Sequence, residues 1–171
     1  MKKIVLILVV AFLANHSYAQ HGERYGHTLN VGLGLGYYGY VYHSTPVINL
    51  NYEFDVARNF TLAPFITFFS YRDRDNYYRQ TVIPIGVKGS YYFDQLLHAD
   101  SKWDFYGAGS LGFAIVKTSW ESGYSGPKND NIGASSLYLD LHIGSEYHFN
   151  NKIGAFLDLS TGVSTIGIAI H

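Results

Sequence analysis

Polar and apolar residues alternate with a period of two along most of this chain, and few folds can accommodate that pattern. Successive side chains of a β-strand point to opposite faces, so the alternation predicts strands with one apolar and one polar face. In 28–38, Leu, Val and Tyr residues alternate with an asparagine and three glycines. In 137–149, apolar residues alternate with Asp, His, Gly and Glu. We therefore predict an all-β protein.

The alternation occurs in eight segments of the sequence. They are 28–38, 46–54, 59–71, 80–93, 103–116, 137–149, 152–161 and 164–171. A tilted membrane strand needs about 9–11 residues. No segment after residue 19 reaches the roughly 18 apolar residues of a membrane helix. We predict an eight-stranded antiparallel up-and-down β-barrel. Its longest polar connections, 70–79 and 117–134, then fall on the side opposite both ends of the strand array.

The alternation gives each residue a parity, inward or outward, and directly paired residues must share it. This parity also predicts the turns. Pairing His148 with Gly154 leaves a three-residue loop, 150–152, where an asparagine can adopt the left-handed conformation. A two-residue turn at Gly162-Val163 has glycine first, as a type II′ turn requires.

Pro64 and Pro84 lie inside two of the predicted strands. Proline lacks the N–H that a ladder uses, and a closed barrel has no edge strand to accommodate it. The two prolines stand symmetrically about Arg74 in the connecting loop. We therefore expect them to lie nearly opposite each other at a paired bulge or distortion.

Alternation alone does not decide which face is buried. A soluble lipocalin-like barrel encloses its apolar face, whereas a membrane barrel turns that face to lipid and keeps polar residues inside. Tyr and Trp prefer the membrane–water boundary, and aromatic residues gather at both ends of the predicted strands. One rim contains Tyr37, Tyr38, Tyr40 and Tyr42, and the other contains Tyr52, Phe54, Tyr91, Tyr92, Phe93, Trp103, Phe105, Tyr147 and Phe149. We therefore predict a transmembrane barrel, with the soluble barrel as the alternative.

The N-terminus predicts export. Lys2 and Lys3 precede the apolar run 4–13, and Ser17-Tyr18-Ala19 provides the small residues of a cleavage site. We predict a signal peptide over 1–19, cleaved after Ala19, and one barrel domain over 20–171. Removal of the two lysines leaves 10 basic against 13 acidic residues, a balance that does not indicate nucleic-acid binding. The absence of cysteine excludes disulfides, thiolate metal sites and cysteine nucleophiles.

Short segments of the chain resemble a known group of proteins. They are Val31-Gly32-Leu33-Gly34-Leu35-Gly36, Asp104-Phe105-Tyr106-Gly107-Ala108-Gly109 and Gly144-Ser145-Glu146-Tyr147. With the strand pattern over 26–171, they resemble small OmpX/OmpA-like barrels, the "outer membrane protein beta-barrel domain" of Bacteroidetes-type bacteria. The resemblance implies a porin-like fold in the Gram-negative cell envelope, contact with outer-membrane lipid and lipopolysaccharide, and insertion by periplasmic chaperones and barrel-assembly machinery. The chain departs from the family's usual aromatic ending, because it ends in Ile168-Ala169-Ile170-His171.

The predicted inward rows contain the residues with the most chemistry. They are Glu53, Lys88, Asp140, His142, Glu146, His148 and Asp158. Buried charges need partners, so we expect a polar network that fills the lumen, and parity places Asp158 opposite Gly144. A metal site or proton relay in the row from Asp140 to His148 is the alternative. We expect no cofactor and no metal.

The predicted outer loops contain basic and aromatic residues that suit contact with a surface ligand of unknown identity. They are Arg72, Arg74, Tyr77, Tyr78, Trp120 and Tyr124. The alternatives are a solvated, self-paired loop tip for the arginines and an upper aromatic girdle for the rings.

Three functions fit a small barrel of this kind. A structural or surface-interaction role is the first, with no open pore, because eight strands leave room only for side chains. A lipid A-modifying outer-membrane enzyme is the second, but the chain has no His-x-Ser pair, and we expect no enzymatic activity. A soluble, periplasmic lipocalin-like binding barrel is the third.

Overall fold

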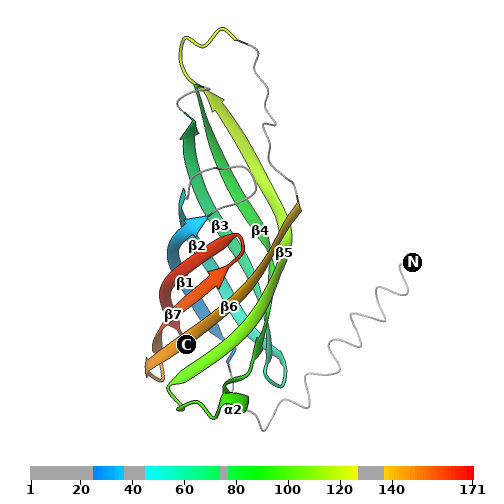
Figure 1. The fold of residues 1–171 in the computed structure, drawn as a ribbon, viewed down its shortest axis with the longest axis vertical. Helices are drawn as coiled ribbons and strands as arrows, with labels where there is room; N and C mark the ends of the chain where they lie inside the picture. The colour runs from blue at the N-terminus through cyan, green and yellow to red at the C-terminus, as the bar shows by residue number, and fades with distance from the viewer. Residues whose placement is uncertain (1–24, 37–44, 74–76, 127–136) are drawn as a thin grey trace, which may run out of the picture.

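The computed structural model describes residues 25–36, 45–73, 77–126 and 137–171. The elements in chain order are β1 (Thr28–Gly36), β2 (Thr45–Ala57), β3 (Phe60–Asp73), β4 (Tyr78–Tyr92), α2 (Asp94–Leu97), β5 (Trp103–Trp120), β6 (Leu137–Asn150), β7 (Ile153–Ser160) and β8 (Val163–Ile170). Each strand pairs antiparallel with the next, and β8 pairs with β1 to close the barrel (Figure 1). The predicted eight-stranded up-and-down barrel is confirmed. The predicted signal peptide, the rim tyrosines at 37–42 and Arg74 lie outside the described residues.

The strands differ in length, which makes the barrel taller on one side. β5 has 18 residues, whereas β7 and β8 have 8 each. Figure 1 shows β3, β4 and β5 extending well beyond β7 at one end of the barrel, with α2 and the end of β8 at the other. About 9–11 residues suffice to cross a bilayer. The far ends of these long strands therefore project past an apolar band set by the shorter ones.

Most large apolar residues face outward, on every strand, but Val47, Phe65, Phe69 and Val82 are buried in the interior. Leu33 on β1 and Leu139 on β6 are each 63% exposed, whereas inward Asp140 is 1% exposed. A continuous apolar surface of this extent requires apolar surroundings, since soluble monomers expose only small patches. The burial pattern is thus that of a membrane barrel. The lipocalin-like alternative is wrong, because its core leucines and isoleucines would have to point inward.

An aromatic band lies across β5 and β6 at the end of the barrel near α2. The ring centroids of Trp103 and Tyr147 are 4.9 Å apart, and Phe105 and Phe149 extend the contact on either side. Tyr92, which we expected in this band, is instead 2% exposed and points into the lumen. In the part of the chain that the structure describes, no helix is long and apolar enough to cross a membrane.

The turn between β6 and β7 is partly as predicted. His148 pairs with Gly154 as parity requires, and the strands end at Asn150 and begin again at Ile153 with a register shift beside the turn. Asn150 does not adopt the expected left-handed conformation. Its side-chain Oδ1 instead accepts hydrogen bonds from the backbone N–H groups of Lys152 and Ile153, at 2.8 and 3.1 Å. A side-chain acceptor therefore stabilises this turn.

The turn between β7 and β8 lies one residue earlier than predicted. β7 ends at Ser160 and β8 begins at Val163, so the turn residues are Thr161 and Gly162. Gly162 does not have a positive φ, and the predicted type II′ geometry is therefore wrong. The physical reason is a carboxylate from another strand, Asp140, which accepts hydrogen bonds from the turn backbone.

The expectation that Pro64 and Pro84 face each other is also wrong. Pro64 pairs with Val87 and Pro84 pairs with Ala114, and no bulge occurs at either proline. The β2–β3 ladder is interrupted beside Pro64, and the β3–β4 ladder beside Pro84. The N–H and C=O of one strand residue point to the same neighbouring strand. Each proline therefore breaks the ladder on one side only, and the barrel tolerates it without a change of register.

A charge placed on the lipid face should destabilise the barrel. Leu141 lies on the outward face of β6 and is 62% exposed. We expect Leu141→Arg to lower the free energy of unfolding in lipid vesicles by about 2–4 kcal/mol, the cost of an arginine near the bilayer midplane. Urea unfolding followed by tryptophan fluorescence measures the change.

Ser119→Arg is the matched control for this variant. Ser119 is an exposed residue on the projecting end of β5, beside exposed Lys117. We expect little change in its free energy of unfolding. Equal losses in the two variants would contradict the outward apolar band.

Candidate functional site

The seven inward residues of the predicted network all lie in the barrel interior. Their side chains belong to four clusters, each with at least one buried carboxylate. We name them the turn cluster around Asp140, the mid-lumen cluster around Asp158, the Glu53 cluster, and the mouth cluster around Glu146 and His148. They lie at different heights in the barrel. Two of these clusters, the turn cluster and the mid-lumen cluster, meet where His142 Nε2 lies 3.7 Å from Asp140 Oδ2.

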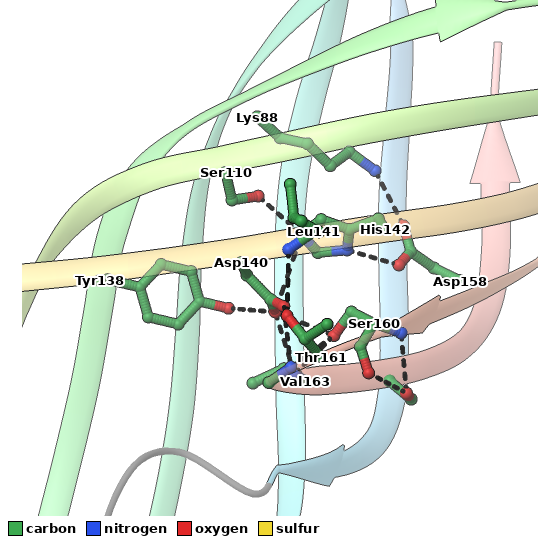
Figure 2. A network of polar contacts seen from close by, with 12 residues as sticks. Lys88, Ser110, Tyr138, Asp140, Leu141, His142, Asp158, Ser160, Thr161 and Val163 are labelled. Atoms are coloured by element: carbon green, nitrogen blue, oxygen red, sulfur yellow. Dashed lines mark hydrogen bonds and ion pairs between the residues drawn. The ribbon is translucent and has the colours of Figure 1, made fainter.

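The mid-lumen cluster spans the barrel from β4 to β7 (Figure 2). Lys88 Nζ lies 3.2 Å from Asp158 Oδ2, and both side chains are more than nine-tenths buried. His142 Nδ1 lies 2.6 Å from Asp158 Oδ1, and its Nε2 lies 2.8 Å from Ser110 Oγ. Tyr106 donates to Asp158 at 2.8 Å, and its ring lies under the ammonium group. This lysine thus has the carboxylate partner that a buried charge needs.

In the turn cluster, the Asp140 carboxylate accepts hydrogen bonds from five donors. They are the hydroxyls of Tyr138, Ser160 and Thr161 and the backbone N–H groups of Gly162 and Val163, at 2.7–3.0 Å. Figure 2 shows these groups converging on the carboxylate. Asp140 is 1% exposed. Its charge is therefore held by hydrogen bonds in place of water, and it joins β6 to the β7–β8 turn.

The Glu53 cluster joins the first four strands near the α2 end. Glu53 accepts hydrogen bonds from Asn30 at 3.4 Å, from Thr61, and from Tyr92 at 2.7 Å. Tyr25 stacks on Tyr92 with ring centroids 4.0 Å apart, and its hydroxyl donates to Asp94 of α2 at 3.1 Å. The aromatic pair covers this end of the lumen beside the cluster.

The mouth cluster lies at the end where β8 finishes. His171 Nε2 is 2.7 Å from Glu146 Oε1, and His148 Nε2 is 2.7 Å from Asp104 Oδ2. Burial and the neighbouring His148 imidazole lower the pKa of His171 below its ordinary value. Two carboxylates and two imidazoles from β5, β6 and the residue after β8 therefore meet at this mouth.

The interior has little free volume. The lumen cavity of about 20 Å³ adjoins the mid-lumen cluster, which is room for about one water molecule. Phe156 fills much of the space beside β1, because Gly32 and Gly167 present no side chain to it. Side chains therefore plug the described part of the lumen.

The predicted surface residues separate into two groups. Arg72 forms an ion pair with Glu121, and Tyr77, Trp120 and Tyr124 form a continuous aromatic stack at the projecting end of β4 and β5. Tyr78 is 6% exposed and points inward, so its assignment as a surface contact is wrong. Tyr78 pairs with Trp120, with 5.6 Å between the ring centroids, whereas Tyr77 precedes the strand and has a positive φ.

Several residues of the site were missing from the sequence-based prediction. They are Asp104, Tyr92, Tyr106 and His171. Parity offered a signal for all four. Asp104 lies between outward Trp103 and Phe105 and shares its face with Tyr106, and His171 shares a face with Ala169. Tyr92 shares a face with Lys88, but it was assigned to the aromatic rim because tyrosine also prefers the membrane–water boundary.

Removal of the Asp140 carboxylate should release the β7–β8 turn. Each hydrogen bond to a charged group contributes about 1.5–3 kcal/mol, so we expect Asp140→Ala to speed amide exchange at Gly162 and Val163 by tenfold or more. Amide exchange of the folded barrel in detergent micelles, followed by NMR, measures the rates.

Asp140→Asn is the matched variant, because it keeps one carbonyl oxygen as an acceptor. We expect a smaller increase of exchange in this variant, with β1–β2 amides unchanged in both. Unaltered exchange at Gly162 in Asp140→Ala would show that the carboxylate does not hold the turn.

Comparison with known proteins identifies a fold and no family. No protein-family model matches the chain, and no curated protein matches it. A de novo designed transmembrane β-barrel is similar in structure, with 13% identity, a TM-score of 0.51, and coverage of 86% of this chain and 98% of that one. The outer-membrane protein Ail of Yersinia pestis, solved in phospholipid bilayer nanodiscs, has 11% identity and a TM-score of 0.43, covering 85% of this chain and 98% of its own. The likeness to the designed barrel and the outward apolar face together show the fold of a transmembrane β-barrel.

Proposed function

We propose that this protein is a small outer-membrane barrel of the OmpX/OmpA-like type with a structural or surface-interaction role and no open pore. The observation that supports the proposal most strongly is the inverted burial of the barrel. Leu33, Leu139 and Leu141 are each more than 60% exposed, while Glu53, Asp140 and Asp158 are buried. An exposed apolar face of this extent needs lipid, or a detergent in its place, to cover it.

The plugged lumen supports a role other than solute passage. The Lys88–Asp158 ion pair crosses the interior, and the adjoining cavity of about 20 Å³ has room for about one water. Ions and nutrients need a continuous aqueous path, which larger barrels provide. The protein therefore acts through its surfaces and not through a channel.

The projecting ends of β3, β4 and β5 are the part best suited to external contacts. Tyr77, Trp120 and Tyr124 stack there above the apolar band, and Arg72 pairs with Glu121 beside them. Rigid aromatic surfaces on a strand scaffold suit recognition. Lipopolysaccharide and surface ligands would meet this end, and export would proceed through signal peptide 1–19, periplasmic chaperones and the barrel-assembly machinery.

Membrane fractionation with a heat-modifiability gel tests the proposal. We expect the protein in the outer-membrane fraction, where the unheated sample migrates differently from the boiled one because a closed barrel resists detergent. In planar bilayers we expect conductance at the baseline. A monomer dissolved in the periplasm would overturn the location, and reproducible conductance above baseline would overturn the plugged lumen.

We also propose that the protein is not a lipid A-modifying enzyme. Such an enzyme needs a nucleophile and a histidine on the lipid-facing side, oriented together. The chain has no His-x-Ser pair, and His142 points into the lumen, where its Nδ1 contacts Asp158. We expect mass spectra of lipid A to show the same acyl pattern with and without the protein, and an altered pattern would contradict this.

A further inference from the structure

Three potential metal ligands converge in the mouth cluster. Glu146, His148 and His171 each offer one ligand atom, and these atoms all lie within 4.8 Å of one another. His171 Nε2 is 2.7 Å and His148 Nδ1 is 3.8 Å from the same oxygen, Glu146 Oε1. Bonds of about 2.1 Å to a tetrahedral metal separate neighbouring ligand atoms by roughly 3.4 Å. Small side-chain movements would therefore accommodate an ion.

Each histidine has a second partner that fixes its ring. The Nε2 atom of His148 lies 2.7 Å from the Asp104 carboxylate, and the Nδ1 atom of His171 lies 2.9 Å from the Thr28 hydroxyl. Metal-bound histidines almost always hold their other ring nitrogen in this way, which sets the tautomer and the ring orientation. The mouth cluster thus has the outer partners of a metal site as well as the ligands.

The hydrogen-bond directions aim both imidazole lone pairs at Glu146. Thr28 donates its hydroxyl hydrogen to the Tyr25 carbonyl at 3.1 Å, so it accepts a hydrogen bond from Nδ1–H of His171. Asp104 likewise accepts from Nε2–H of His148. The remaining nitrogens, Nε2 of His171 and Nδ1 of His148, then present lone pairs to a carboxylate oxygen. Only a cation between these atoms, a proton or a metal ion, makes that arrangement favourable.

We propose that Glu146, His148 and His171 bind a divalent transition-metal ion of the zinc class, with water at the fourth position. Two imidazole nitrogens and one carboxylate oxygen are a known zinc ligand set with an open position. Calcium and magnesium prefer sites built from oxygen alone. This proposal departs from our expectation of no metal, because His171 joins Glu146 and His148 from beyond β8, whereas Asp140 and His142 of the same β6 row belong to other clusters.

The site has an access route. An open pocket of about 420 Å³ adjoins it, lined by Ser101, Lys102, Asp104, His148, Phe149, Asn150 and Asn151. The side chains of His148 and His171 are 23% and 19% exposed. Glu146 and Asp104 supply two carboxylates against two imidazoles, which favours a divalent cation over an anion. The pocket reaches His148 and its partner Asp104, and the partial exposure of His171 opens the other side of the site to solvent.

Metal binding would link strands that are not neighbours. Glu146 and His148 lie on β6, and His171 follows β8, with β7 between the two strands. A ligand that binds only the folded state stabilises it. The bound ion would therefore strengthen the end of the barrel where β8 meets β1.

Calorimetric titration of the folded, detergent-solubilised barrel with Zn²⁺ tests the proposal. The protein should carry no polyhistidine tag and be treated first with a chelator. We expect one Zn²⁺ per chain with micromolar or tighter affinity, and no comparable binding of Mg²⁺. We expect His171→Asn to abolish this binding and Asp104→Asn to weaken it about 10–100-fold, the usual effect of an outer partner.

His98→Asn is the matched control, since His98 is exposed beside α2 and lies outside the cluster. Its Zn²⁺ affinity should equal that of the unaltered protein. A heat-modifiability gel verifies that each variant folds. Zinc binding that survives His171→Asn, or no one-to-one binding by the unaltered protein, would overturn the proposal.

NMR of the unaltered protein gives a second test that needs no variant. We expect Zn²⁺ to shift the imidazole signals of His148 and His171 while those of His98 stay unchanged. The two histidines should show the tautomers fixed by Asp104 and Thr28, with the metal on Nδ1 of His148 and Nε2 of His171. Shifts confined to other histidines would show that the mouth cluster is only a hydrogen-bonded network.

Discussion

Pairing of β8 with β1 is the constraint on which the rest of the structure depends. The ladder runs from Leu29↔Ile170 to Gly36↔Val163, and it leaves every strand with two neighbours. A bilayer offers no water to unpaired backbone groups, so only a closed sheet can cross it. Closure also separates the two faces, with apolar side chains outside and polar side chains enclosed. The enclosed groups must then find partners in one another.

Small residues make this closure compatible with a filled interior. Gly32 pairs with Gly167 across the β1–β8 seam, and the Phe156 ring lies against both. A side chain at either glycine would compete with the ring for the same space. The lumen is therefore filled on this side by one aromatic residue from β7, and charged, polar and other apolar side chains such as Phe65 and Phe69 fill the remaining interior.

The enclosed polar groups serve different purposes at different heights. Asp140 accepts hydrogen bonds from the backbone at the β7–β8 turn. Asp158 neutralises Lys88 across the lumen, and Glu53 joins the first four strands. The mouth cluster differs from these, because its carboxylates face two partly exposed imidazoles and an open pocket. The carboxylates of the first three clusters are buried, and the groups around them compensate the buried charge. Only the mouth cluster combines convergent ligand atoms with access from solvent.

Alternation by itself predicted the number of strands, the face of most strand residues and pairs such as His148↔Gly154 and Gly144↔Asp158, because side-chain direction in a strand depends on position. The tertiary structure alone decided which inward residues meet. Asp140 reaches the Gly162 backbone, and His171 reaches Glu146, across gaps of more than twenty residues. Such contacts depend on the tilt and stagger of the closed sheet, and a local pattern contains neither quantity. The turn at Thr161-Gly162 and the mouth cluster therefore could not be predicted from the chain.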